Sequence, residues 1–245
     1  MSHMRSNSTT TVYNIGKYDA AKMTVQGFNT DPDTAKFWWA MKHELLPKFA
    51  AARPNPAHSF LGQLHRMGKL QTVVTQNVDG LHQQGGVPAD KVVELHGNMR
   101  GLICSRNPTI LNPLPYPGEG SCAYRCSHEE ALESSYHAGV ALPLCPLCGE
   151  APLRTETVMF GQPMPAEELV AARAAVAAAD LLLIVGSTLI VEPANSLPAQ
   201  AMLQGTPVVM VNFDETKFDD HCCTVVRRPA GVFLGAVAER MRCPS

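Results

Sequence analysis

Apolar residues along this chain follow two spacings, one typical of helices and one typical of buried strands. In residues 33–49 the apolar positions recur at helical spacing, and a second helical pattern covers 57–67 before Gly68 ends it. An alanine-rich stretch over 167–179 reads as another helix. The sequence therefore predicts helices over these three ranges.

Short continuous apolar runs lie between the helical patterns and predict strands that are buried on both faces. The clearest runs are residues 72–75, 181–185 and 208–211, and the shorter ones are 92–95 and 224–226. Such strands, alternating with helices, are typical of a parallel sheet covered on both sides. We expect an α/β fold with a doubly wound, Rossmann-like, mainly parallel sheet.

Residues 100–155 depart from this alternation. They contain five of the eight cysteines together with many prolines and glycines. We interpret them as a small zinc-binding module inserted into the Rossmann-like domain. The expected division is a domain formed by residues 5–99 and 156–245, with the module between its two parts.

The composition excludes several classes of partner. A net charge of −2 and a pI near 6.5 argue against nucleic acid, or an anionic membrane surface, held by bulk electrostatics. No apolar run approaches the roughly 18 residues that a membrane span requires. Clustered cysteines without a secretion signal are more typical of metal ligands than of a disulfide scaffold, so we expect an intracellular, reducing compartment.

The sequence Cys145-Pro-Leu-Cys148-Gly is a zinc knuckle, in which two thiolates are spaced to bind one tetrahedral ion. The ion needs a second pair of ligands, and three cysteines could provide it. We favour Cys104 and Cys126, with Cys122 as the main rival for either position. Such a closed site would be structural, and the alternative is a set of free thiols packed in a loop.

Polar residues follow two of the predicted strands. Gln76, Asn77 and Asp79 come directly after 72–75, and His96 follows the run 92–95. In doubly wound folds the carboxyl ends of the strands bind ligands, and an imidazole with a pKa near neutrality can accept a proton from a sugar hydroxyl. The alternatives are a capped strand before a turn and a packed histidine.

Two further strand ends give weaker signals. Gly186 and Ser187 follow the run 181–185, where small residues allow a phosphate or ribose to approach the backbone, although a plain turn has the same composition. Asn212 and Asp214 follow 208–211, where an acidic group suits ribose hydroxyls.

Taken in order along the chain, these motifs resemble the sirtuin family from about residue 13 to the end. They are Thr-Gln-Asn-Val-Asp-Gly-Leu-His, Glu-Leu-His-Gly-Asn, the cysteine pairs, Phe-Gly at 160–161, Val-Gly-Ser-Thr-Leu-Ile-Val-Glu-Pro at 185–193 and Val-Asn at 211–212. The resemblance implies an NAD-dependent protein-lysine deacylase that releases nicotinamide and O-acyl-ADP-ribose. Its partners would be acyl-lysine proteins or peptides, with NAD and zinc as cofactors.

The resemblance also implies roles for individual residues. His96 would be the general base, and Asn77 would order the ribose and a water molecule. The residues that would contact NAD are Gln76, Asn77, Asp79, Gly186, Ser187, Asn212, Asp214 and Pro229. The residues that would bind the substrate as an added β-strand are Val158, Phe160, Gly161, Val191 and Glu192.

One departure from the family's pattern leaves other functions open. The opening Gly-Ala-Gly-Ile-Ser segment of the family, and the Asp-Phe-Arg that follows it, have no counterpart in these residues. In the family they supply the first strand, the phosphate-binding turn and part of the nicotinamide pocket. The alternatives are therefore mono-ADP-ribosyl transfer in the same pocket, or a non-catalytic, zinc-stabilised module that binds a peptide or a nucleotide.

Overall fold

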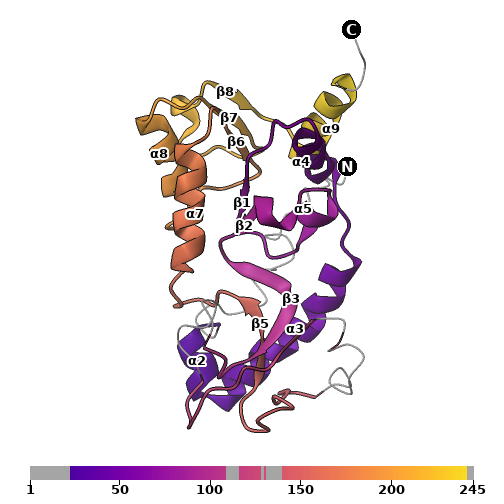
Figure 1. The fold of residues 1–245 in the computed structure, drawn as a ribbon, viewed down its shortest axis with the longest axis vertical. Helices are drawn as coiled ribbons and strands as arrows, with labels where there is room; N and C mark the ends of the chain where they lie inside the picture. Colours follow the sequence, from indigo (N-terminus) through magenta and orange to yellow (C-terminus); the bar gives the residue numbers. More distant parts are fainter. Residues whose placement is uncertain (1–22, 109–115, 128–129, 131–139, 242–245) are drawn as a thin grey trace.

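The computed structural model describes residues 23–108, 116–127, 130 and 140–241. Parallel strands and the helices around them form the upper part of the molecule in Figure 1. An antiparallel sheet and a long helix form the lower part. None of the helices within these ranges is long and apolar enough to cross a membrane.

The parallel strands confirm the α/β fold expected from the apolar runs. β1 (Val73–Thr75) pairs with β2 (Val92–Glu94), and Thr75 lies opposite Glu94. A second parallel sheet has the order β6 (Leu182–Val185), β7 (Val208–Val211) and β8 (Thr224–Val226). Within the described residues the strands form two parallel sheets, because β1 and β6 do not pair with each other.

Helices cover both faces of these sheets. One hydrophobic core joins α4 (Pro56–Arg66) and α9 (Ala230–Arg240) to one face. The other core joins α7 (Ala166–Ala177) and α8 (Ser196–Leu203) to the opposite face. Since both cores include residues of both sheets, the two sheets belong to one three-layered structure.

Short connecting elements place the strand ends. The turn α5 (Leu81–Gln84) and the 3-10 turn η2 (Ala89–Lys91) link β1 to β2, and η4 (Asp219–His221) precedes β8. α4 begins at a capping box, in which Asn55 accepts from the backbone N–H of His58 and the His58 ring accepts from the N–H of Asn55.

The lower part of the molecule has a separate core. The antiparallel sheet has the order β4–β3–β5, formed by β3 (Gly97–Cys104), β4 (Arg125–Ser127) and β5 (Leu153–Thr157). α2 (Val25–Thr30) and α3 (Pro32–Ala51) pack against it. The expected division places residues 5–99, which include both helices, in the Rossmann-like domain, and the domain boundaries stay a prediction.

α3 confirms the predicted helix 33–49, and its N-cap and its buried face explain why it forms. Asp31 caps its first turn by accepting from the N–H groups of Asp33 and Thr34. Both tryptophans of the chain lie on its buried face, and Nε1 of Trp39 donates to the backbone oxygen of Leu153 at 2.8 Å. α4 and α7 likewise confirm the predictions for 57–67 and 167–179.

Candidate active site

The motif after β1 forms a tight turn at the carboxyl end of the strand. The N–H of Asn77 donates to Oγ1 of Thr75 at 3.0 Å, and Oδ1 of Asp79 accepts from the N–H of Leu81, also at 3.0 Å. Gly80 has a φ of +69°, a conformation that glycine adopts without strain. Asp79 therefore holds the first N–H of α5 with one carboxylate oxygen.

His96 lies beside this turn because β1 and β2 are parallel neighbours. The N–H of Leu95 donates to the backbone oxygen of Thr75 at 2.9 Å, which extends the pairing to the residue before His96. Nδ1 of His96 lies 3.1 Å from the backbone oxygen of Gln76. A carbonyl oxygen only accepts, so Nδ1 carries the proton and Nε2 is the free base.

Burial keeps this base neutral. It lowers the pKa of His96 below its usual value of 6.5, and the hydrogen bond to Gln76 opposes that shift. A second buried polar group lies close by, since Nε2 of Gln76 has no hydrogen-bond partner among the described residues. An unpaired buried donor indicates a site for a polar ligand, and the ribose and amide groups of NAD fit this requirement.

Arg100 lies beside Gly80 and pairs with Glu94, a contact that sequence reasoning missed. Its guanidinium makes two hydrogen bonds of 2.8 Å to the carboxylate of Glu94, which also accepts from Gln83 on α5. A Cβ on Gly80 would come within 2.5 Å of Nη1 of Arg100, so a side chain at this position would displace the end of that arginine. The only sequence signal for this contact is an arginine six residues after Glu94.

The ends of β6 and β7 provide the other predicted cofactor residues. Gly186 has a φ of +59° with open space where a Cβ would lie, and Oγ of Ser187 accepts from the N–H of Leu189 at 3.2 Å. Asn212 is buried and donates to the backbone oxygen of Asp214 at 2.8 Å. The side chain of Asp214 is exposed, and Pro229 precedes the first turn of α9.

The structure brings together four of these residues around one cavity of about 500 Å³. They are Gln76, Asn77, Gly186 and Ser187. The first residues of α9, Ala230 and Gly231, also line this cavity directly after Pro229. Asp79, His96, Asn212, Asp214 and Pro229 do not line it, and the contacts of all the predicted cofactor residues with NAD stay a prediction.

The residues predicted to bind the substrate lie on two separate loops. Val158 continues from β5, and its N–H donates to the backbone oxygen of His96 at 2.9 Å. The oxygen of Phe160 accepts from the N–H of Val25, while its side chain is exposed; Gly161 follows with a φ of +76°. Val191 and Glu192 are exposed on the loop after β6. Their role in binding a substrate peptide stays a prediction.

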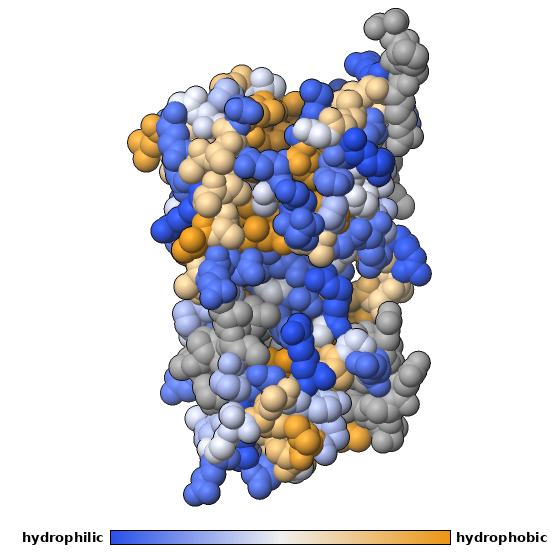
Figure 2. Space-filling model, in the orientation of Figure 1, coloured by the Kyte–Doolittle hydropathy of each residue, from blue (hydrophilic) through white to orange (hydrophobic). Residues whose placement is uncertain are grey.

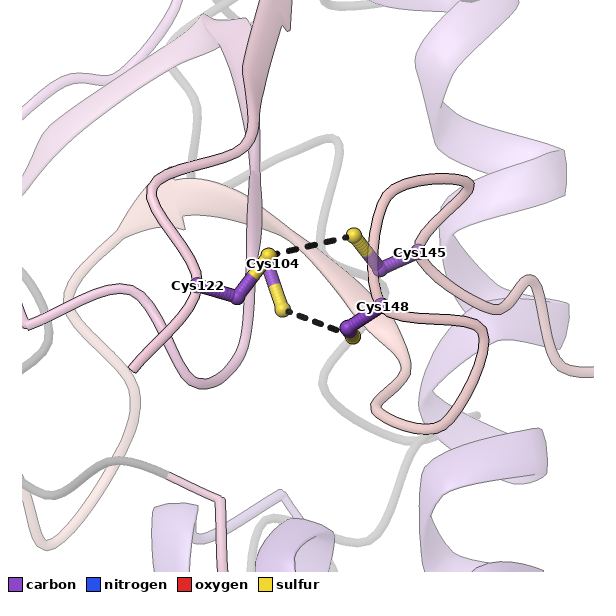
Figure 3. A group of neighbouring side chains, drawn as sticks. All are labelled: Cys104, Cys122, Cys145 and Cys148. Carbon is purple, nitrogen blue, oxygen red and sulfur yellow. Dashed lines mark hydrogen bonds between the residues drawn. The ribbon is translucent and has the colours of Figure 1, made fainter. Parts of the chain in front are cut away.

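Four cysteines converge in the lower part of the molecule (Figure 3). They are Cys104, Cys122, Cys145 and Cys148, and their sulfur atoms all lie within 4.8 Å of one another. The Sγ atoms of Cys104 and Cys148 are 3.8 Å apart, and those of Cys122 and Cys145 are 3.6 Å apart. A zinc ion with Zn–S bonds of about 2.3 Å places tetrahedral sulfurs about 3.8 Å apart, so this set fits the metal.

The prediction that Cys126 is a ligand was wrong, and Cys122 takes its place. In the β3–β4 hairpin Cys126 lies opposite Leu102, inside the paired strands. Cys122 precedes β4, and its N–H donates to the backbone oxygen of Arg106 beyond the end of β3, on the side of the zinc knuckle. The spacing of cysteines along the chain could not distinguish these positions, since it does not show where the strands pair.

Known proteins are similar to this chain in both sequence and fold. Residues 5–193 match the model of the Sir2 family. The NAD-dependent protein deacetylase 1 of Pyrobaculum aerophilum is 33% identical over 226 residues, which cover 92% of this chain and 80% of the relative. The NAD-dependent protein deacylase of Pyrococcus furiosus is 33% identical over 227 residues, covering 92% and 82% of the two chains.

A solved structure agrees with these matches. It is described as Sir2 with a p53 peptide and NAD+, it has a TM-score of 0.74, and it is 29% identical. The superposition covers 89% of this chain and 81% of that chain.

Proposed function

Since this chain belongs to the Sir2 family, we propose that it is an NAD-dependent protein-lysine deacylase that releases nicotinamide and O-acyl-ADP-ribose. The observation that carries the proposal is the position of His96 beside Gln76 and Asn77 at one sheet edge, with its Nδ1 bound to a backbone oxygen. The substrate would be an acyl-lysine peptide, and a similar solved structure is described as Sir2 bound to an acetylated peptide.

The site residues at the carboxyl ends of β1 and β2 have roles that follow from their contacts. Nε2 of His96 would accept a proton from a substrate hydroxyl, because its other nitrogen is already occupied. The unpaired amide of Gln76 would donate to a polar group of the cofactor, and Asp79 would accept with its remaining oxygen. NAD, when bound, supplies the ribose to which the acyl group is transferred.

Zinc would have a structural role instead of a catalytic one. The four sulfur atoms make a closed set with no open position for a substrate, which is typical of a structural ion. The ion would hold the loop of Cys145 and Cys148 against the end of β3, and so stabilise the sheet whose strand β5 leads to Val158 beside His96.

Nicotinamide release from NAD in the presence of an acetyl-lysine peptide tests the proposal. We expect the rate to fall by on the order of 10²–10⁴ in His96→Ala, the usual loss when a general base is removed. His65→Ala is the matched control, because that histidine lies in the last turn of α4 and not at the carboxyl ends of β1 and β2. Release that does not depend on His96 would contradict the proposal, and release without loss of the acetyl group would indicate ADP-ribosyl transfer.

A further inference from the structure

The carboxylate of Glu94 joins three segments around the candidate base. Glu94 ends β2, two residues before His96, and its side chain is only 15% exposed. One oxygen accepts from Nε2 of Gln83 on α5 at 2.8 Å, and the other accepts from Nδ2 of Asn98 on β3 at 3.2 Å. Arg100 on β3 donates to both oxygens at 2.8 Å. Charge-assisted bonds of this two-pronged kind fix orientation as well as distance.

Main-chain pairing with β5 does not fix this part of β3. β3 pairs with β5 at Gly97 and again from Leu102, with a register shift between these two positions. Inside that interval the N–H of Met99 donates to the backbone oxygen of Val78 at 2.9 Å. The interval is therefore bound to the turn that follows β1, and its side chains decide how firmly the two are held together.

Arg100 also covers that turn. Its Nη1 and Cδ would lie 2.5 Å and 3.3 Å from a Cβ placed on Gly80, the N-cap of α5. Figure 2 shows hydrophilic surface between the upper and lower parts of the molecule, where β2 leads into β3. Arg100 is 46% exposed, and exposed ion pairs usually contribute little. Here the partner carboxylate is largely shielded and bonded on both oxygens, so the pair can hold a geometry.

We propose that the ion pair of Glu94 and Arg100 is a positioning pair, which holds the turn carrying Asn77 and Asp79 in place beside His96. Neither member lines the cavity of about 500 Å³, so both act through the residues that they hold. The inference rests on the proposed function, because the turn and the base must act on one cofactor. It adds residues that set the alignment of that cofactor without contacting it.

Arg100→Met tests the proposal, because methionine keeps an apolar stem and removes both bonds to Glu94. We expect the Kd of NAD, measured by calorimetry, to rise and kcat for nicotinamide release to fall, each on the order of tenfold, since small misplacements of reacting groups are costly. KM for the acetyl-lysine peptide should stay the same, because no described bond of the pair reaches residues 158–161 or 191–192. Hydrogen exchange at residues 79–84 should become faster.

Three further variants separate positioning from a general loss of stability. Arg100→Lys keeps the charge but has a single nitrogen, so it should recover only part of the loss. Lys48→Met breaks the exposed pair of Lys48 with Glu44 on α3 and should change none of these quantities. Glu94→Gln combined with Arg100→Met should lose no more than Glu94→Gln alone, because the two side chains act as a unit.

Three outcomes would overturn the proposal. Unchanged NAD affinity and kcat in Arg100→Met would mean that the contact is a surface ion pair only. Losses that simply add in the double variant would mean that the two residues act separately. A raised KM for the peptide, with faster exchange in β7 and α8 as well, would mean that the whole fold is weakened. If the unsubstituted chain releases no nicotinamide, the proposed function fails by itself, and unchanged exchange at 79–84 in Arg100→Met then decides against the positioning pair.

Discussion

At the scale of single residues, the chemistry depends on which nitrogen of His96 carries the proton. Because the backbone oxygen of Gln76 fixes the proton on Nδ1, the base is Nε2, and it acts only while the ring is neutral. Burial lowers the pKa of His96, so the neutral ring persists to a lower pH than in an exposed histidine.

This argument predicts the acid limb of the pH profile. As the pH falls through the lowered pKa, His96 gains a proton and the rate declines, so the half-maximal kcat/KM should lie below pH 6.5. The measurement is nicotinamide release at saturating peptide and limiting NAD over a range of pH. His65→Ala should keep the same profile, and an acid limb centred above pH 6.5 would count against His96 as the base.

The burial of Lys42 leads to a second prediction about a single residue. Its ammonium group is buried between the ring of Trp38 and Sδ of Met99, and burial, with a smaller effect from Arg154, lowers its pKa to about 7. The unfolded chain has a value near 10.5. The folded state therefore favours the neutral amine, and keeping the ammonium charged in the folded state lowers the stability of the fold. This loss of stability is complete below pH 7 and becomes smaller as the pH rises to 10.5.

Lys42→Met should remove this loss of stability. We expect the free energy of unfolding to rise by a few kcal/mol near pH 6–7, since one pKa unit corresponds to about 1.4 kcal/mol, and by little near pH 10. Urea unfolding at several pH values measures the difference. Lys36→Met, at an exposed position on the same helix, is the control, and a gain in Lys42→Met that does not vary with pH would contradict the reasoning.

Some site residues could be placed from the sequence and others could not. Gln76, Asn77 and His96 could be placed because each follows an apolar run, and parallel strands end at the same edge. Arg100 could not, because its contacts with Glu94 and over Gly80 depend on how the chain turns after His96.

At the scale of elements, strand pairing decides which cysteines bind the ion. The register of the β3–β4 hairpin holds Cys126 opposite Leu102, whereas Cys122 lies beyond the end of β3, beside the knuckle. We predict that Cys122→Ala loses the metal, while Cys126→Ala keeps about one zinc per chain. Elemental analysis of the purified variants measures this, and equal zinc contents would show that the ligand set is wrong.

Single helices and strands were predicted better than the pairing of strands, because the spacing of apolar residues is a property of one segment. α3 continues through Pro47, which lacks an N–H for the helix, because Leu45, Leu46 and Phe49 around it are buried. The pairing of strands depends on distant segments instead. The runs at 72–75 and 181–185 predicted two strands correctly, but nothing in them indicates that their edges stay apart.

At the scale of the whole molecule, three hydrophobic cores divide the chain into two parts with different supports. Two cores lie on the faces of the parallel sheets, and neither includes a zinc ligand. The third core contains Cys104, Cys122 and Cys145 together with both tryptophans of α3. The metal should therefore stabilise the lower part of the molecule and leave the parallel sheets largely unaffected.

Removal of the metal with a chelator should separate these parts. Trp38 and Trp39 are the chain's only tryptophans, and both lie in the zinc-containing core, so their fluorescence reports on that core alone. We expect a red shift of the emission and faster hydrogen exchange in α3 and β5, because binding of the ion stabilises this fold. α8, α9 and β7 should keep their protection, and nicotinamide release should stop because Val158, at the end of β5, bonds to His96.

Added zinc should restore both signals, whereas magnesium should not, since thiolates bind it poorly. Unchanged tryptophan emission in a chain shown to be free of metal would contradict this division.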